Sequence, residues 1–330
     1  MMASDNPVRI VHIDPAGFDD VAIEQSTLAA ELGPIDFDSV DTSGESIADD
    51  VERADIILTH YASVPALAMD ATGCSVITCY ATGVDNVDVE AATERGVAVT
   101  NVPKYCDEEV GEHIVTLALA LRRGLPQYEA HTADGGWDWK AANSVHTATS
   151  QTFGFFAFGR KARVAARKAS AFGFDIIAHD PYLSDEEIRD AGAEPVSFDG
   201  LITGSDVLSL NAPLTPETEG RFDASVFNQM RDGSILINTA RGKLVDEAAL
   251  LDALNHGPLI GAGLDVLATE PPEADNPLLQ HPDTIVTPHA AWYSPDAVER
   301  VRRRGSQIAA AAYNGKAVDG VVNPDALRGE

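Results

Sequence analysis

Residues 152–162 read Thr-Phe-Gly-Phe-Phe-Ala-Phe-Gly-Arg-Lys-Ala, an apolar run that ends at a glycine. The run predicts a buried strand, and a helix is predicted over about 160–172. A strand-to-helix turn of this kind binds dinucleotides, and its second glycine, here Gly159, lets the backbone approach the pyrophosphate. Ala157 replaces the first glycine of that fingerprint and needs a backbone conformation that alanine tolerates. Ala162 replaces the third, where alanine is a known alternative.

An acidic residue follows this turn at the distance that the fingerprint requires. Residues 174–179 predict the next strand, and Asp180 comes directly after it, 21 residues beyond Gly159. A carboxylate there binds the ribose 2′-hydroxyl and disfavours the 2′-phosphate of NADP. Taken alone, Asp180 before Pro181 is also typical of a turn. An NAD-binding unit is predicted by the combination of these features: a strand, a glycine turn, a helix, a second strand and an acidic residue after it.

The rest of the chain predicts more strands that alternate with helices. Such alternation implies right-handed crossovers and parallel sheets. Further strands are predicted over 8–13, 55–59, 75–80, 97–100, 206–210, 234–238, 260–266 and 284–287. Further helices are predicted over 18–33, 88–95, 107–123 and 295–314, and the long apolar helix 107–123 is suited to linking two domains. The segment 131–150 is expected to be an extended arm or a plain linker, and its Trp137 and Trp139 favour a buried or oligomeric contact.

The length and the net charge of the chain indicate how many domains it has and which kinds of partner it disfavours. A chain of 330 residues predicts two domains. Asp and Glu number 52 against 23 Lys and Arg, and this net charge of −29 disfavours nucleic acid and anionic membranes as partners. An anionic substrate therefore needs a locally basic site. Only six of the cationic residues are Lys, which favours a halophilic protein over an acidic mesophilic one.

Three cysteines and the N-terminal residues bear on the compartment. Cys74, Cys79 and Cys106 are odd in number and lack metal-ligand spacing, so neither disulfides nor a metal site is expected. The N-terminus has neither the basic nor the apolar region of a secretion signal, and no apolar run approaches the roughly 18 residues of a membrane span. These features predict a cytoplasmic protein.

Three further segments place chemical groups just after predicted strands, where open α/β sheets bind ligands. They contain Arg241, Asp265 with Glu270, and His289. Oxidation of a 2-hydroxy acid needs a cation for the carboxylate, a base for the hydroxyl proton and a group that tunes the base. Arg241, His289 and Glu270 fit these roles in that order. A carboxylate beside His289 keeps the imidazole protonated, as the acid that keto-acid reduction needs.

These residues and their order are similar to those of the D-isomer-specific 2-hydroxyacid dehydrogenase family, which the chain resembles over nearly its whole length. The matching stretches are Gly83-Val-Asp-Asn-Val-Asp88, Thr100-Asn-Val-Pro103, Asn211-Ala-Pro-Leu-Thr-Pro-Glu217, Arg241-Gly, Gly263-Leu-Asp-Val-Leu, Glu270-Pro271 and Pro288-His289. The resemblance implies that Arg241, Glu270 and His289 are catalytic and that Asp265 contacts the nicotinamide. It implies a substrate-carboxylate loop at Ala81-Thr82-Gly83-Val84, whose amides would form an anion nest. The expected NAD contacts are Phe158, Gly159, Arg160, Lys161, Asp180, Asn211, Ala212, Pro213, Thr218, Thr239, Ala240 and Asp265.

The resemblance also implies an architecture. A flavodoxin-like substrate domain is expected at 1–101 plus 290–330, with a Rossmann-type, doubly wound NAD-binding domain at 102–289 inserted into it. A homodimer built on the cofactor domain and the arm with Trp137 and Trp139 is expected. The substrate-binding set is Tyr61, Ala81, Thr82, Gly83, Arg241, His289 and Trp292, and Tyr80 is expected to help shape the pocket.

Two other functions remain open. Residues 289–294, His-Ala-Ala-Trp-Tyr-Ser, look most like the C-terminal-binding-protein branch of the family, where Trp292 would line the pocket unless it is ordinary core. That branch includes transcriptional corepressors, so a protein that senses NADH with little turnover is one alternative. 3-Phosphoglycerate dehydrogenase is the other. It is disfavoured because no Lys or Arg flanks the substrate loop and because the sequence ends at Glu330 without a further regulatory domain.

Overall fold

The computed structural model describes residues 6–18, 20–41, 47–142 and 145–327, and the chain divides into two units. Unit 1 is made of Met1–Tyr105 and Ser294–Glu330, and unit 2 is Cys106–Tyr293. The chain passes from unit 1 to unit 2 after residue 105 and returns to unit 1 after residue 293. Each of these boundaries lies four residues beyond the one expected from the sequence, 101 and 289. The first crossing immediately precedes a helix that begins at Asp107, and the second immediately precedes Ser294, which caps the last helix.

Unit 1 is built on a five-stranded parallel sheet with the order β2-β1-β3-β4-β5. This order is that of flavodoxin, so the predicted class of this unit is confirmed. The strands are β1 Val8–His12, β2 Ile35–Ser39, β3 Ile56–Thr59, β4 Val76–Cys79 and β5 Ala98–Thr100. The helices are α1 Ala22–Leu32, α2 Ile47–Asp50, α3 Ala66–Thr72, α4 Val89–Glu94 and α12 Pro295–Tyr313. The helix predicted from residue 18 thus begins later, after a short 3-10 turn at Pro15–Gly17.

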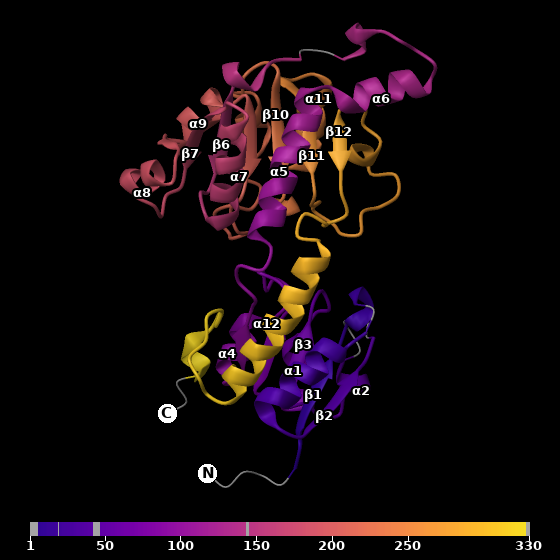
Figure 1. Ribbon diagram of the computed structural model, residues 1–330, viewed down its shortest axis with the longest axis vertical. Coiled ribbons are helices and arrows are strands. Elements are labelled where there is room, and N and C mark those ends of the chain that lie inside the picture. The colour runs from indigo at the N-terminus through magenta and orange to yellow at the C-terminus, as the bar shows by residue number, and fades with distance from the viewer. Residues whose placement is uncertain (1–5, 19, 42–46, 143–144, 328–330) are drawn as a thin grey trace. The chain divides into compact units, whose positions relative to one another are not determined.

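The core of unit 1 lies between its sheet and the helices that cover both faces of that sheet. β3 and β4 are buried along their whole length, which is why they read as continuous apolar runs. The edge strand β2 alternates instead, with Asp36 and Asp38 exposed and paired with Arg9 of β1. Its apolar residues are too few to predict a strand from the sequence. α12 packs against α1 and β4, so residues close to the C-terminus complete a core begun near the N-terminus (Figure 1).

Unit 2 is built on a seven-stranded parallel sheet with the order β12-β11-β10-β9-β6-β7-β8. The order reverses between β6 and β9, as in the Rossmann fold, and the predicted fold class is confirmed. The strands are β6 Thr152–Phe156, β7 Asp175–His179, β8 Glu194–Pro195, β9 Val207–Leu210, β10 Ser234–Asn238, β11 Leu259–Leu264 and β12 Thr284–Val286. The helices are α5 Asp107–Arg122, α6 Leu125–Ala133, α7 Arg160–Ala171, α8 Asp185–Asp190, α9 Phe198–Gly204, α10 Ala224–Phe227 and α11 Glu247–Asn255.

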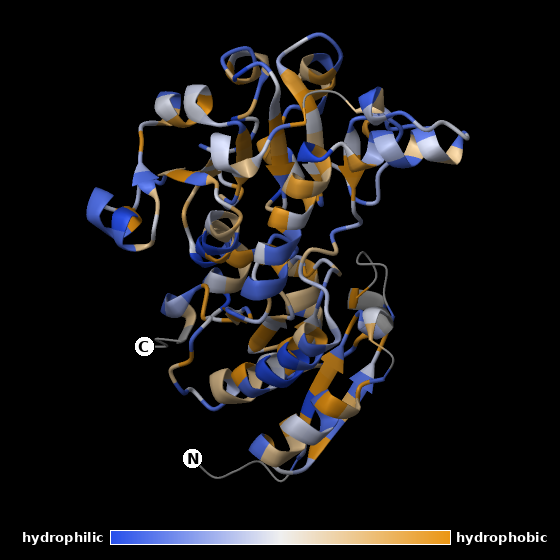
Figure 2. Cartoon of the chain, turned by 45° about the horizontal axis from the view of Figure 1, so that its top comes forward, coloured by the Kyte–Doolittle hydropathy of each residue, from blue (hydrophilic) through white to orange (hydrophobic). Residues whose placement is uncertain are grey.

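Helices and apolar strands form the interior of unit 2. In both units many strands are apolar, the helices carry both apolar and hydrophilic residues, and most loops are hydrophilic (Figure 2). α5, the helix expected to link the domains, lies wholly in unit 2 and packs on α7. The two helices approach so closely at Gly111 that a Cβ there would overlap the side chain of Val164.

The segment with the two tryptophans differs from the expected arm. α6 ends at Ala133, and short 3-10 turns follow at Trp139–Ala141 and Ala148–Ser150. Figure 1 shows α6 extending away from the sheet of its own unit. Trp137 is 93% exposed and Trp139 is 77% exposed, so neither is buried within the chain, and the alternative of an oligomeric contact stays a prediction.

In the described part of the chain, no helix has both the length and the apolar character needed to span a membrane.

Candidate active site

The predicted site residues of unit 2 follow the carboxyl ends of its parallel strands and therefore share one edge of the sheet. Two strands in the middle of the sheet, β6 and β9, flank the point where the strand order reverses, which is where open α/β sheets bind ligands. The site residues after the strands are Gly159 (β6), Asp180 (β7), Asn211 (β9), Arg241 (β10), Asp265 (β11) and His289 (β12).

The glycine turn after β6 is open to a ligand. Gly159 is the N-cap of α7, its position carries no side-chain cap, and a Cβ built there meets no atom within 4 Å. The first turn of α7 contains Arg160 and Lys161 and no acidic residue. Free N–H groups at a helix N-terminus bind phosphate. Lys161 adds positive charge to this end of the helix, whereas Arg160 is paired with the Asp107 carboxylate at 3.0 Å. These features fit the pyrophosphate of a dinucleotide.

Asp180 is fixed beside the glycine turn by backbone hydrogen bonds. The N–H of Phe158 donates to its Oδ2 at 2.8 Å, and the N–H of Tyr182 donates to its Oδ1 at 2.9 Å. A carboxylate accepts about four hydrogen bonds, so it retains capacity for ribose hydroxyls. This geometry leaves Asp180 able to bind a ribose, and that role stays a prediction.

Ala157 adopts a left-handed backbone with φ of 64°, where glycine is favoured. We expect Ala157→Gly to raise the free energy of unfolding by about 1 kcal/mol, because the strain outweighs the entropy that glycine loses on folding. Urea unfolding measures this change. Ala162→Gly in α7 is the matched control and should lower stability by at least about 1 kcal/mol. If both variants lose stability, Ala157 is not strained.

The loop after β9 is organised by its own polar side chains. Asn211 donates its N–H to the carbonyl of Phe156 at 2.9 Å, and its side-chain amide donates to the carbonyl of Ser209 at 3.0 Å. Thr218 donates its hydroxyl to the carbonyl of Pro213 at 2.7 Å. These bonds hold the segment from Asn211 to Thr218, which includes the buried Ala212, beside the reversal of strand order. After β10, Thr239 and Ala240 continue this edge, and the Ala240 N–H donates to Asn238 at 3.1 Å.

His289 and Glu270 form a hydrogen-bonded pair. The distance from His289 Nδ1 to Glu270 Oε2 is 2.7 Å, and about a third of each side chain is exposed, 34% and 37%. The N–H of Leu267 donates to the other oxygen of Glu270 at 2.9 Å. Burial favours a raised pKa of Glu270, but the hydrogen bonds from His289 and Leu267, with the charges of His289 and Arg241, lower that pKa below its usual value. Glu270 is therefore ionised beside His289.

Arg241 completes the predicted catalytic set on the same unit. Its backbone begins a 3-10 turn at Gly242–Leu244, and its Nη1 donates to the carbonyl of Ala240 at 2.7 Å. Its charge acts on Glu270, so the cation lies within electrostatic range of the pair. The close approach depends on Gly242, where a Cβ would overlap the backbone of Leu267. The guanidinium, imidazole and carboxylate side chains are thus carried by one unit.

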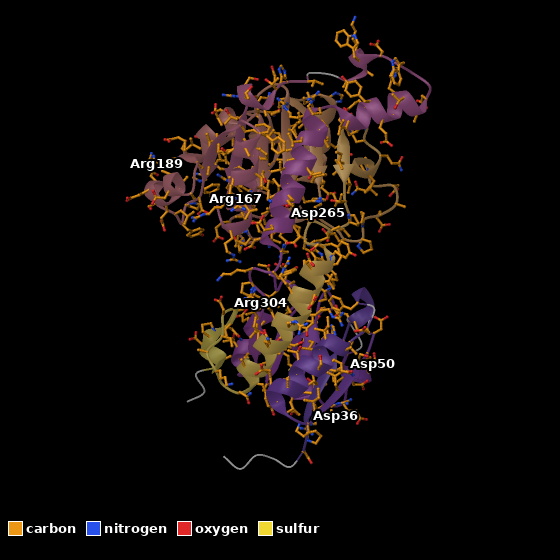
Figure 3. The ribbon with its side chains drawn as sticks, in the orientation of Figure 1. Asp36, Asp50, Arg167, Arg189, Asp265 and Arg304 are labelled. Carbon is orange, nitrogen blue, oxygen red and sulfur yellow. The ribbon has the colours of Figure 1, made fainter. Side chains whose placement is uncertain are left out.

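Asp265 holds the turn that carries His289. It is 1% exposed, and its Oδ1 accepts from the Thr287 hydroxyl at 2.6 Å and the Ala290 N–H at 2.8 Å, while Oδ2 accepts from the Ala291 N–H at 2.9 Å. The backbone N–H of His289 donates to the carbonyl of Asp265 at 2.8 Å. Figure 3 shows Asp265 at the arrowhead end of β11. The sequence suggested only a nicotinamide contact for this residue.

Sequence reasoning missed His113, which supports the same turn. This α5 side chain lies 2.9 Å from the Thr287 hydroxyl through Nε2, and the hydroxyl in turn donates to Asp265. Burial lowers the pKa of His113, although the charge of Asp265 opposes the shift. A polar residue beside the apolar positions Val110 and Ile114 of the predicted helix was the available signal.

The predicted substrate residues of unit 1 follow β3 and β4. Tyr61 is 56% exposed and stacks on His60, and Ala81, Thr82 and Gly83 are half-buried after β4. The expectation for Tyr80 is wrong, because this side chain is fully buried and its hydroxyl lies 2.8 Å from that of Ser306. Trp292 belongs to unit 2, is half-buried and packs edge-on against Tyr293.

Comparison with known proteins identifies the family. Residues 115–291 match the model of the D-isomer specific 2-hydroxyacid dehydrogenase NAD-binding domain, and the chain belongs to this family. NAD is therefore the cofactor of unit 2, in agreement with the glycine turn and Asp180.

Individual relatives span several activities. D-3-phosphoglycerate dehydrogenase of Archaeoglobus fulgidus is 39% identical over 63% of this chain and 40% of its own length. Glycerate dehydrogenase of Methylorubrum extorquens is 38% identical over 68% of this chain and 71% of its own. The NAD complex of NAD-dependent formate dehydrogenase from Staphylococcus aureus is 29% identical with a TM-score of 0.83, covering 94% of this chain and 97% of that one. The chain spans about half the length of the D-3-phosphoglycerate dehydrogenases it matches, between 40% and 59%.

Proposed function

We propose that the protein is an NAD(H)-dependent oxidoreductase that interconverts a D-2-hydroxy acid and its 2-keto acid. The observation that carries this proposal is the His289–Glu270 pair, 2.7 Å apart, at the same sheet edge as the open glycine turn. A proton donor with its carboxylate partner, beside a dinucleotide site and a cation, matches what reduction of a keto acid requires.

Each residue of the site has a separate role in the proposed reaction. NAD(H), when bound, supplies or accepts the hydride. Arg241 holds the substrate carboxylate by charge-assisted hydrogen bonds. Because His289 Nδ1 is bonded to Glu270, Nε2 is the ring nitrogen that gives a proton to the carbonyl oxygen of a keto acid, or takes it from a hydroxyl. Ionised Glu270 stabilises the imidazolium and fixes the ring. We assign the substrate-carboxylate nest to the amides of residues 81–84.

The pair also favours a hydroxy acid over formate. Oxidation of formate to carbon dioxide removes a hydride and leaves no hydroxyl proton to transfer. A histidine held by an ionised glutamate has no proton to move in that reaction. The pair therefore supports substrates with a hydroxyl or carbonyl group.

The experiment that tests the proposal is loss of NADH absorbance with a panel of 2-keto acids in about 2 M KCl, a salt range that screens the net charge. The panel holds glyoxylate, hydroxypyruvate, pyruvate, phenylpyruvate and 2-ketoisocaproate, with NADPH in parallel. Turnover with NADH preferred supports the proposal and the role of Asp180. NADH binding, seen by fluorescence, without turnover of any acid contradicts it and favours an NADH-sensing regulator.

We further propose that the protein is a homodimer whose interface includes the exposed Trp137 and Trp139. An apolar pocket is lined by residues of α5 and α6, among them Leu119, Leu125 and Tyr128, and the Tyr128 hydroxyl donates to the carbonyl of Trp139 at 2.7 Å. Light scattering in high salt should give twice the chain mass of 35.0 kDa. Replacing both tryptophans by serine should raise the dimer dissociation constant at least about tenfold, because interface aromatics dominate binding energy. Tyr182→Ser removes an equally exposed aromatic as a control, and a monomer in the unmodified protein contradicts the proposal.

A further inference from the structure

His289 stands in a turn whose backbone needs support from its surroundings. Its φ of 51° lies in the left-handed region, which is uncommon for residues other than glycine. A backbone of this kind persists where the surrounding structure fixes it. The N–H of His289 donates to the carbonyl of Asp265, and the Asp265 carboxylate accepts from the N–H groups of Ala290 and Ala291. The position of Asp265 therefore decides where the imidazole of His289 lies.

Helix α5 packs on strand β11 in a regular register that ends at Asp265. Two glycines of the strand lie against two leucines of the helix: Gly261 against Leu121, and Gly263 against Leu117. At each pair a Cβ on the glycine would lie within 3.2 Å of the leucine side chain, so the helix rests directly on the strand. The next step, two residues along the strand and one turn back along the helix, pairs Asp265 with His113, whose Nε2 is 3.7 Å from Oδ1. His113 is thus the residue of this helix face that reaches the catalytic end of the strand.

The proton positions in this contact follow from counting donors. A hydroxyl has one proton, and that of Thr287 goes to Oδ1 of Asp265 at 2.6 Å. The Thr287 oxygen must then accept from Nε2 of His113, 2.9 Å away, so Nε2 carries a proton. Burial lowers the pKa of His113 against the charge of Asp265, which favours a neutral ring with its single proton on Nε2. The result is a chain of hydrogen bonds in one direction, from His113 through Thr287 to Asp265.

We propose that His113 is a positioning residue for the proton transfer by His289. Its Nε2–H fixes the Thr287 hydroxyl on Asp265, whose carboxylate holds the amides that follow His289. The inference rests on the proposed function, in which His289 moves the proton. Hydrogen bonds in series strengthen one another in a protein interior, so loss of the first weakens those after it. The effect falls on kcat, because the chain ends at the turn that carries the proton-transferring group.

Two variants of His113 test the chain at its first bond. His113→Leu fills similar space without a donor and should lower kcat about tenfold, which corresponds to about one hydrogen bond. His113→Gln places an amide N–H close to the position of Nε2 and should recover most of that loss. The KM of the keto acid and the affinity for NADH should change little, because Arg241 and the glycine turn follow other strands. An unchanged kcat in His113→Leu overturns the proposal.

A double variant shows whether His113 acts through the hydroxyl of Thr287. Thr287→Val removes the hydroxyl at nearly constant shape and should lower kcat at least as far as His113→Leu does. Adding His113→Leu to Thr287→Val should then cause little further loss, because the effects of coupled groups are not additive. Losses that multiply in the double variant overturn the proposal. If His113→Leu does not fold, Thr287→Val and Thr287→Ser, which keeps the hydroxyl, test the same chain, and equal losses in these two overturn it.

A control on the same helix separates positioning from stability. Val115→Ala removes buried methyl groups two residues from His113 and should lower the melting temperature without lowering kcat. A fall of kcat in Val115→Ala as large as that in His113→Leu would mean that His113 only stabilises the helix, and overturns the proposal.

A measurement that needs no turnover distinguishes this inference from the proposed function. In protein with 15N-labelled histidine, the ring signals of His113 are assigned by their loss in His113→Gln. Near neutral pH they should be those of a neutral ring with its proton on Nε2. A proton on Nδ1 alone, or on both nitrogens, overturns the inference whether or not a substrate is found. Absence of turnover with every 2-keto acid, with the expected ring signals, overturns the proposed function and the catalytic role of His113, but not the chain of hydrogen bonds.

Discussion

Replacing His289 by alanine is expected to lower kcat at least about 100-fold, the low end for loss of a general acid. The imidazole is the group that moves the proton, and its Nδ1 is held by Glu270 at 2.7 Å. The measurement is steady-state turnover of the best keto acid at saturating NADH. NADH affinity, followed by fluorescence, should change little, because the glycine turn and Asp180 lie on other strands of unit 2.

Glu270→Gln is the matched comparison for this prediction. Glutamine keeps the size of the side chain and one acceptor oxygen for His289 but removes the charge that stabilises the imidazolium. Its kcat should fall by less than that of His289→Ala, and its activity should depend more steeply on pH. A loss smaller than about 100-fold in His289→Ala would remove this residue from the role of acid.

Arg241→Ala is expected to lower kcat/KM at least about 100-fold, with most of the loss in KM. Two hydrogen bonds from a guanidinium to a carboxylate are each worth about 1.5–3 kcal/mol, so losing both is costly. In a protein with a net charge of −29, no diffuse positive surface compensates for a missing local cation. Initial rates across a range of keto-acid concentrations separate KM from kcat.

Two variants show whether the loss in Arg241→Ala is specific. Arg241→Lys keeps the charge without the planar fork and should recover only part of the activity. Lys243→Ala removes a cation two residues away, in the same 3-10 turn, and should have little effect on KM. Equal losses in Arg241→Ala and Lys243→Ala would indicate a general charge effect.

The parts of the fold predicted from the sequence are those with a strong local pattern. β6, β7 and β10 are apolar runs bounded by turn residues, and the long helices α5 and α12 show clear periodicity. β2 escaped prediction because it is an edge strand whose Asp36 and Asp38 face water and pair with Arg9 of another strand. α6 escaped because its first turn contains Pro126, and no residue of it is buried within the chain.

In the site, too, the residues with a local sequence pattern could be predicted, whereas the contacts between residues far apart in the chain could not. Arg241, Glu270 and His289 are each recognisable where they stand in the sequence. Their pairing distance, and the support that Asp265 and His113 give to the His289 turn, come from bonds between residues far apart in the chain. His113 and Thr287, for example, are 174 positions apart. Asp14 likewise accepts hydrogen bonds from the N–H groups of residues 46 to 48 positions away, which no local pattern in the sequence indicates.

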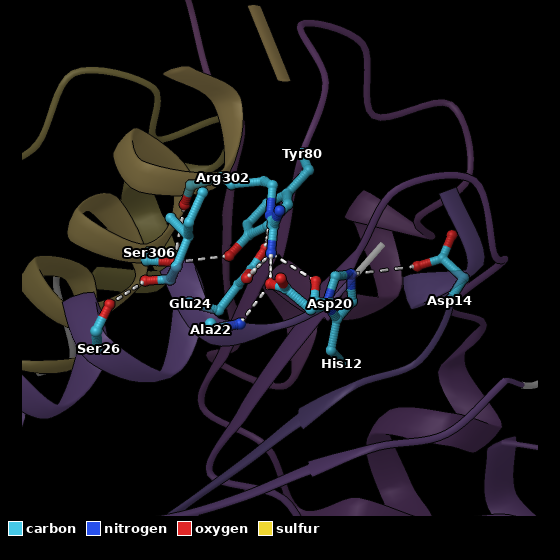
Figure 4. Close-up of polar contacts among 10 residues, drawn as sticks. His12, Asp14, Asp20, Ala22, Glu24, Ser26, Tyr80, Arg302 and Ser306 are labelled. Carbon is cyan, nitrogen blue, oxygen red and sulfur yellow. Dashed lines mark hydrogen bonds and ion pairs between the residues drawn. The ribbon is translucent and has the colours of Figure 1, made fainter. Parts of the chain in front are cut away.

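The order in which the chain is made has a consequence for unit 1. Unit 2 is one continuous segment, whereas unit 1 needs α12, and Arg302 on α12 pairs with Glu24 of α1, 278 positions earlier. During synthesis the N-terminal strands leave the ribosome first, yet Glu24 lacks both its ion-pair partner (Figure 4) and the helix α12 that packs on α1 until nearly the last residues emerge. We therefore expect the N-terminal part of unit 1, Met1–Tyr105, to remain incompletely packed in the nascent chain while unit 2 folds. Chains interrupted before α12 should retain an NADH-binding unit 2 and be degraded from unit 1.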